Sequence, residues 1–149
     1  FSNLTDDGVA ASNSAATGCS TDYPLIRLAD VYLMAAEALL RGGSGISRGE
    51  ALNLVNQVRL RAYNNDESGK ISDADLTLDF ILDERGRELY LESIRRTDLV
   101  RFGKFTSDSY IWQWKGGVLD GRSVNERYNI YPIPDTDLTA NPNLSNPLY

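Results

Sequence analysis

The strongest constraint on the fold is the contrast between two segments in the second half of the chain. Residues 85–104 read RGRELYLESIRRTDLVRFGK, a helix–turn–helix pattern crowded with arginines and carboxylates. Residues 128–149 read YNIYPIPDTDLTANPNLSNPLY, in which repeated proline and asparagine exclude regular structure. We therefore expect charged helices that pack against each other, followed by an irregular tail that wraps over them.

Upstream of Gly103, apolar residues recur at helical spacing. The predicted helices are 25–39 after a cap at Asp22, 51–62 after the capping box Ser47–Glu50, 78–92 after a cap at Thr77, and 96–102. The first helix is apolar almost all round and should be covered on several sides. Small residues and a glycine-rich turn predict that the helices pair as tetratricopeptide-like hairpins.

The predicted organisation has three parts: an irregular lead-in at 1–21, helical hairpins at 22–103, and an irregular Pro/Asn-rich tail at 104–149. Within the tail, residues 110–114 alternate in the manner of a strand, and Gly-Gly and Asp-Gly turns follow. The expected fold class is therefore mainly α, with one or two short strands in the C-terminal segment.

Two residues inside the third predicted helix break its pattern. Arg85 lies on the apolar face, which indicates a semi-buried guanidinium held by a carboxylate such as that of Asp98. Gly86 costs about 1 kcal/mol relative to alanine inside a helix, so we expect a neighbour that packs closely against it.

Charge and composition exclude several classes of function. A net charge of −6 disfavours nucleic acid, which requires clustered Lys and Arg. The chain has no histidine, which removes the commonest general base and the usual zinc ligand. The only cysteine, Cys19, can form no internal disulfide. The chain opens at Phe1 without a signal peptide, so we expect a fragment or a processed product.

Carboxylates on the third predicted helix invite comparison with a glycosidase, whose reaction needs two such groups. Glu84 and Glu88 lie one turn apart on a single helix, too close in sequence to flank a sugar from two sides. Neighbouring arginines can neutralise them, so a structural ion-pair network explains these residues and no catalytic residue is predicted.

The polar segment 64–75 has some features of a calcium loop. Asn64, Asp66, Ser68 and Asp75 match ligand positions of an EF-hand, but the first should be Asp and the last Glu. Lys70 would also repel the ion. The alternative is a polar connector between hairpins, and no cofactor or metal is expected.

Three aromatic residues, Tyr110, Trp112 and Trp114, would project to the same side of the predicted strand. Such a row can stack on the apolar C–H faces of sugar rings, which makes these residues the candidate carbohydrate-binding set. The alternative is that the rings seal the C-terminal segment onto the helices.

Several segments in fixed order resemble the C-terminal part of the SusD/RagB family of Bacteroidetes. The segments are YPLIRLADVY at 23–32, AEA at 36–38, DERGREL at 83–89, RRTDLVRFG at 95–103, YPIP at 131–134, NPNL at 141–144 and NPLY at 146–149. Residues 110–117 also resemble the starch-binding members. The ordered set is specific, although each segment alone would be weak.

The resemblance implies a non-enzymatic, surface-exposed lipoprotein of the outer membrane with a tetratricopeptide-like scaffold. Family members capture oligosaccharides for a SusC-like TonB-dependent transporter, and their lipid anchor and most sugar-contacting aromatic residues would lie upstream of this chain. Residues 1–149 would then be the C-terminal portion of one domain. The alternative function is a helical-repeat scaffold for protein partners that binds no sugar.

Overall fold

A computed structural model describes Val9 and residues 24–149. This part of the chain is mainly helical, as expected, and contains no β-strand. The chain divides into two compact units, residues 1–77 and residues 78–149. The predicted cap Asp22 and Cys19 lie outside the described residues. Within the described ranges, the helices are all too short or too polar to cross a membrane.

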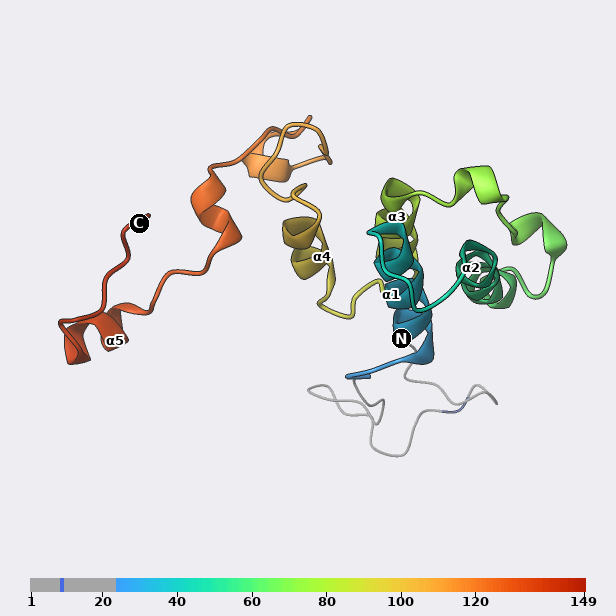
Figure 1. Cartoon of the computed structure of the whole chain (residues 1–149). Coiled ribbons are helices and arrows are strands. Elements are labelled where there is room, and N and C mark those ends of the chain that lie inside the picture. The colour runs from blue at the N-terminus through green and yellow to red at the C-terminus, as the bar shows by residue number, and fades with distance from the viewer. Residues whose placement is uncertain (1–8, 10–23) are drawn as a thin grey trace. The chain divides into compact units, whose positions relative to one another are not determined.

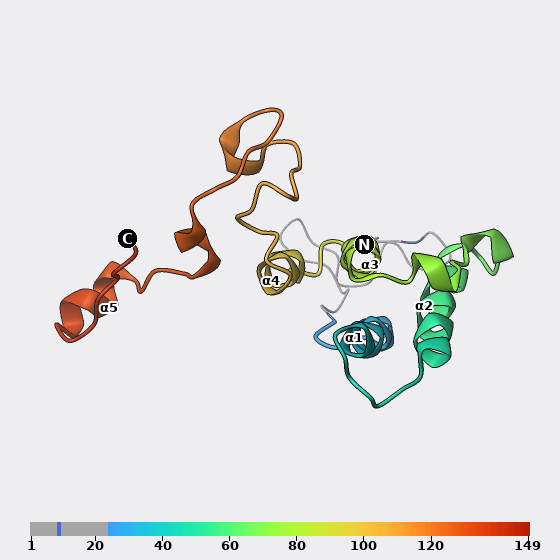
Figure 2. The same ribbon diagram turned by 45° about the horizontal axis from the view of Figure 1, so that its top comes forward.

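The first unit is built on helices α1 (Leu28–Leu40) and α2 (Arg48–Ala62), which pack against each other (Figures 1 and 2). Its most deeply buried apolar side chains come from both helices and from the connector that follows them: Leu33, Ala36, Ala51, Val55, Val58 and Leu76. Burial stabilises each of the larger side chains by about 1.5–3 kcal/mol. Element order and packing agree with a helical hairpin, while tetratricopeptide-like stacking stays a prediction.

Helix α1 begins three residues later than predicted. The apolar pattern extends back to Leu25, but Arg27 is in an extended conformation and its side chain makes no cap bond. Leu25 and Ile26 are more than 80% exposed, at 85% and 81%. A helical turn that is held by no packing is marginal in water, which explains the later start.

Helix α2 begins as predicted, at the Ser47–Glu50 capping box. The Ser47 hydroxyl accepts a hydrogen bond from the Glu50 N–H at 3.2 Å, and the Ser47 N–H donates to the Glu50 carboxylate at 2.7 Å. These two bonds satisfy N–H groups that have no partner within the helix itself.

Side chains of α2 hold the connector that leads out of the first unit. Asn56 bonds both the C=O and the N–H of Ile71, at 3.1 and 2.8 Å. Arg48 donates to the carboxylate and the carbonyl of Asp73, and also to the Leu76 carbonyl at 3.1 Å. The connector contains two short 3₁₀ helices, η1 (Glu67–Gly69) and η2 (Asp73–Asp75).

The second unit is organised around Asp98. Arg85 of α3 (Leu78–Glu88) donates from Nε to the Asp98 carboxylate of α4 (Arg95–Arg101) at 2.8 Å, and both side chains are 3% exposed. Arg101 donates to the other Asp98 oxygen at 2.6 Å. The predicted pairing of Arg85 with Asp98 is therefore confirmed, and it joins two helices.

The expected close neighbour of Gly86 is the Arg95 side chain. A Cβ placed on Gly86 would lie 2.9 Å from an Arg95 nitrogen, and that nitrogen donates to the Leu82 carbonyl at 2.6 Å. Helix α3 ends four residues before the predicted Glu92. Leu91 and Ser93 have left-handed φ values of 65° and 59°, which are incompatible with continuing the helix.

The strand predicted at residues 110–114 is wrong. The backbone turns left-handed at Trp114, with φ 68°, and enters a 3₁₀ helix, η3 (Lys115–Gly117). The Lys115 ammonium, almost completely buried, donates to the carbonyls of Lys104, Ser107 and Tyr110 at 3.2, 2.5 and 2.6 Å. The Lys115 side chain thus supplies hydrogen bonds to three backbone carbonyls. In a β-sheet, a neighbouring strand would supply such bonds.

The tail is more regular than predicted. A 3₁₀ helix, η4 (Glu126–Asn129), and a six-residue helix, α5 (Asp135–Ala140), interrupt the irregular segments. Pro134 occupies the N-cap position of α5 and Asp135 its first turn, where proline's fixed φ and a carboxylate favour a helix start. Asn146 then bonds both the N–H and the C=O of Ile133, at 2.8 and 2.9 Å.

The first prediction concerns the Asp98 carboxylate. We expect Asp98→Asn to lower the free energy of unfolding by about 3–5 kcal/mol, because it removes the buried negative charge that Arg85 and Arg101 both contact. Asp73→Asn is the matched control: it removes an exposed ion pair with Arg48 and should cost less than about 1 kcal/mol. Urea unfolding of the full-length variants checks this, and equal costs would contradict the assigned role of Asp98.

The second prediction concerns Lys115. Lys115→Met keeps the length of the side chain but leaves three backbone carbonyls without their donor, so we expect a loss of about 2 kcal/mol. Lys70→Met is the control, since Lys70 pairs with Glu67 at the surface. Thermal unfolding measures both variants. A Lys115→Met variant as stable as the control would show that the ammonium does not stabilise the segment at residues 104–110.

Candidate functional site

Tyr110 joins the loop at residues 104–117 to helices α3 and α4. Its hydroxyl donates to the Asp83 carboxylate of α3 at 2.6 Å and accepts from Arg95 of α4 at 2.5 Å. Burial and the bond to Asp83 raise the pKa of Tyr110 above its usual value. These contacts match the alternative in which the predicted aromatic set seals the C-terminal segment onto the helices.

Trp112 lies beside Tyr110 and borders a small pocket. The two ring centroids are 6.3 Å apart in an edge-to-face arrangement, and the Lys115 ammonium lies 4.7 Å from the Trp112 ring. The pocket has a volume of about 420 Å³ and is lined by aromatic, aliphatic and arginine side chains: Arg95, Arg96, Leu99, Phe105, Tyr110 and Trp112.

Trp114 is not among the residues that line this pocket. Its backbone is left-handed, so the alternation that predicted three rings on one side ends before it. Its side chain is 65% exposed, against 38% for Trp112. The structure therefore brings two of the three predicted rings together and leaves the third in the following turn.

Sequence reasoning missed the other pocket residues, above all Phe105 and Arg96. The guanidinium of Arg96 lies over the Phe105 ring at 5.1 Å from its centroid. Arg96 falls in the predicted helix 96–102 and Phe105 in the predicted irregular tail, and only the fold brings them together. Arg96 also borders a larger groove formed with the tail.

The carboxylates of the segment that resembles a calcium loop are engaged in local turns. Asp66 accepts from the Ser68 N–H at 2.9 Å, and this bond lowers the pKa of Asp66. Asp75 accepts from the hydroxyl and the N–H of Ser72 at 2.6 and 3.0 Å, which lowers its pKa as well. In the part of the chain that the structure describes, no group of three or more Cys, Asp or Glu side chains is arranged to hold a metal ion.

The remaining two residues of that loop also follow the connector. Asn64 has a left-handed φ of 52° in the turn that follows α2, and Ser68 lies inside η1. This geometry is that of a capped polar connector, the alternative considered for the segment.

Three carboxylates of α3 are paired with cations, and Asp79 lies 3.6 Å from the Lys104 ammonium. Arg87 contacts Glu84 at 2.6 Å, and Arg95 approaches Asp83 at 3.9 Å. Because Glu84 is almost completely buried, it is poorly placed to act on a sugar. The described geometry is that of an ion-pair network.

Comparison with known proteins identifies the family. The model of the SusD family matches residues 2–149. The starch-binding protein SusD of Bacteroides thetaiotaomicron is 43% identical over 145 residues, which cover 97% of this chain and 24% of that protein. A SusD-like protein of Bacteroides ovatus is 38% identical over 96 residues, 62% of this chain and 16% of the relative.

A third relative, the SusD-like protein P38 of Formosa agariphila, is 36% identical over 124 residues, 71% of this chain and 24% of that protein. The chain thus spans about a quarter or less of the length of these relatives, at 24%, 16% and 24%. The match of the family model covers nearly every residue, so this chain belongs to the SusD family.

Proposed function

We propose that the complete protein captures oligosaccharides of the starch type at the bacterial cell surface without altering them chemically. Residues 1–149 act mainly as scaffold. The observation that carries the proposal is the 43% identity, over 97% of this chain, to a starch-binding protein.

The proposal extends to a partner and a location. The captured glycan passes to a SusC-like TonB-dependent transporter in the outer membrane. The protein is a surface-exposed lipoprotein whose lipid anchor lies outside the residues of this chain. Membership of the SusD family supports both statements.

Capture without catalysis agrees with the chemistry of the second unit. A glycosidase places two carboxyl groups on opposite sides of the scissile bond. Asp83 and Glu84 of α3 instead pair with the arginines Arg95 and Arg87. Recognition then depends on ring stacking and hydrogen bonds, which need no reactive group.

Among the predicted carbohydrate-binding residues, Trp114 is the best candidate for contact with sugar. The Tyr110 and Trp112 rings contact each other, Arg95 lies over the Tyr110 ring, and Lys115 lies over the Trp112 ring. Trp114 keeps 65% of its surface exposed. We therefore assign Tyr110 and Trp112 mainly to the scaffold and Trp114 to a sugar contact.

One observation favours the alternative of a scaffold for protein partners. Leu28, Val31 and Met34 of α1 are exposed apolar side chains spaced by three residues, a pattern typical of a face that another helix covers. The tests below separate this alternative from sugar capture.

The third prediction addresses the function directly. Full-length protein should be retained by insoluble starch and released by maltohexaose, and prolonged incubation should leave the maltohexaose intact. Chromatography of the supernatant checks for shorter products. Retention on no polysaccharide would overturn the proposal, and release of shortened oligosaccharides would overturn its non-catalytic part.

The fourth prediction concerns Trp114. Stacking of a sugar on a ring contributes on the order of 1 kcal/mol, so Trp114→Ala should weaken maltohexaose binding about fivefold without changing the melting temperature. Tyr63→Ala is the control, because Tyr63 is a half-exposed aromatic residue of the other unit. Calorimetric titration measures both. Unchanged affinity in Trp114→Ala would contradict the sugar contact assigned to Trp114.

A further inference from the structure

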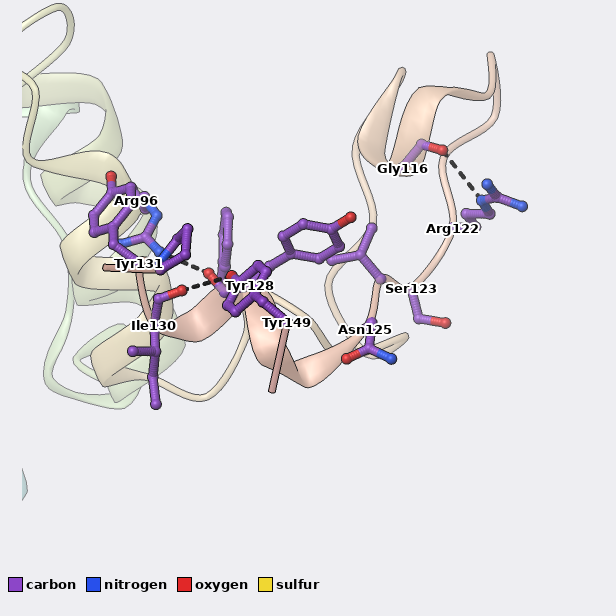
Figure 3. A pocket seen from close by; sticks show the side chains of 12 residues that line it. Arg96, Gly116, Arg122, Ser123, Asn125, Tyr128, Ile130, Tyr131 and Tyr149 are labelled. Carbon is purple, nitrogen blue, oxygen red and sulfur yellow. Dashed lines mark hydrogen bonds between the residues drawn. The ribbon is translucent and has the colours of Figure 1, made fainter. Parts of the chain in front are cut away.

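A groove of about 770 Å³ lies in the second unit, between α4, the turn at residues 116–125 and the C-terminal tail (Figure 3). Its volume falls within the range of about 300–1,000 Å³ that is usual for small-ligand sites. It is a different hollow from the pocket beside Trp112, although Arg96 and Phe105 border both.

One wall of the groove is a supported aromatic ring. The guanidinium carbon of Arg96 lies 3.9 Å from the centroid of the Tyr131 ring, and Figure 3 shows the two side chains stacked. Arg96 is held in turn by a 2.6 Å bond to the Tyr128 carbonyl. Tyr131 nevertheless remains 72% exposed, so the ring face away from Arg96 is open to a ligand.

Two further tyrosine rings, those of Tyr128 and Tyr149, are fixed in the same groove. Tyr128 and Tyr149 meet edge to face with centroids 6.5 Å apart. The Tyr149 hydroxyl donates to the carbonyls of Arg127 and Ile130 at 2.9 and 2.8 Å. Because these bonds already order the rings, a ligand loses little free energy in organising the site.

Hydrogen-bond donors border these rings. Arg122 donates from Nε to the Gly116 carbonyl at 3.1 Å, which leaves its terminal nitrogens for a ligand, and it lies with Gly116 at the end of the groove away from Tyr131 (Figure 3). Asn125 accepts from the Arg127 N–H through Oδ1 at 2.9 Å, which leaves its amide NH₂ as a donor. No Asp or Glu is among the described residues that line the groove, although the chain carries 21 of them.

We propose that this groove binds a short oligosaccharide at a site separate from the sugar contact assigned to Trp114. The C–H face of one sugar ring stacks on Tyr131, and hydroxyls of sugars further along the oligosaccharide accept hydrogen bonds from Asn125 and Arg122. The inference rests on the proposed glycan-capturing function and extends it to a named set of residues.

The chemistry of the groove favours a saccharide over a peptide. A peptide that binds by strand addition needs an exposed strand edge, and the described residues contain no strand. A proline-rich peptide shares the preference for aromatic grooves, and its backbone carbonyls can pair with the same donors, so here the proposed glycan-capturing function selects the saccharide. A saccharide presents apolar C–H faces to the rings and hydroxyls to both side-chain donors, so it matches the whole lining.

A fluorine label at Tyr131 tests the groove itself. Fluorotyrosine is placed at position 131 of the full-length protein, and the fluorine NMR signal is followed during titration with maltohexaose, cellohexaose and a proline-rich peptide. Fluorotyrosine at Tyr90 is the matched control, because Tyr90 is equally exposed, at 71% against 72%, and does not line the groove. We expect an oligosaccharide to shift the signal of position 131 saturably while that of position 90 stays constant.

Two variants that carry the fluorine label at position 131 test whether Arg122 and Asn125 donate hydrogen bonds to the oligosaccharide. Arg122→Ala and Asn125→Asp should each raise the oligosaccharide concentration at half-saturation about tenfold, the effect of one charged or strongly oriented hydrogen bond. Asn125→Asp keeps an acceptor for the Arg127 N–H and replaces the NH₂ donor with a charged acceptor, so it tests the donated bond even if Arg122→Ala does not fold. Lys70→Ala, in the first unit, should leave the titration unchanged.

The outcomes separate this inference from the proposed function. If full-length protein binds starch but no oligosaccharide shifts the signal at Tyr131, the groove proposal is wrong and the function stands. If cellohexaose shifts that signal while starch is not retained, the groove stands and the starch specificity is wrong. A response to the proline-rich peptide alone would overturn the saccharide assignment.

Discussion

The second unit depends on the Asp98 carboxylate, which is buried between two helices and shared by two arginines. Arg85 approaches it from α3 at 2.8 Å, and Arg101 from its own helix at 2.6 Å. A charge in this position is costly unless it is paired, so the pair fixes how α3 and α4 lie against each other. Arg95, whose contacts reach Leu82 and Tyr110, sits in α4 beside this pair and depends on the same packing.

Cationic and amide side chains take the place of regular structure in both units. Lys115 holds three carbonyls of the loop before it, and Arg96 holds the Tyr128 carbonyl of the tail. In the first unit, Asn56 and Arg48 hold the connector in the same way. Long irregular segments thus become ordered without strands, and each satisfied carbonyl avoids the cost of burial without a partner. The aromatic residues that we propose as sugar contacts, Trp114 and Tyr131, belong to these irregular but ordered segments.

The sequence predicted the fold well where a residue either completes or breaks the pattern of its own helix. The Ser47–Glu50 capping box, the pairing of Arg85 with Asp98 and the close neighbour of Gly86 were all predicted correctly. The alternation at residues 110–114 was misleading, because a buried lysine after it bends the chain and no strand lies beside it. Helix α5 was missed because Pro134 was interpreted as a break and not as a helix start. The grouping of Arg96 with Phe105 and Tyr131 depends on contacts across the fold, which no spacing in the sequence indicates.

The central claim, that the Asp98 charge pair sets the packing of α3 against α4, is tested most directly by a double-mutant cycle. The free energy of unfolding is measured for the parent protein, Arg85→Leu, Asp98→Leu and the double variant. The account predicts a coupling of about 2–3 kcal/mol, with the double variant more stable than the sum of the single losses implies. A coupling below about 0.5 kcal/mol would mean that the two side chains contribute independently, and it would contradict the account.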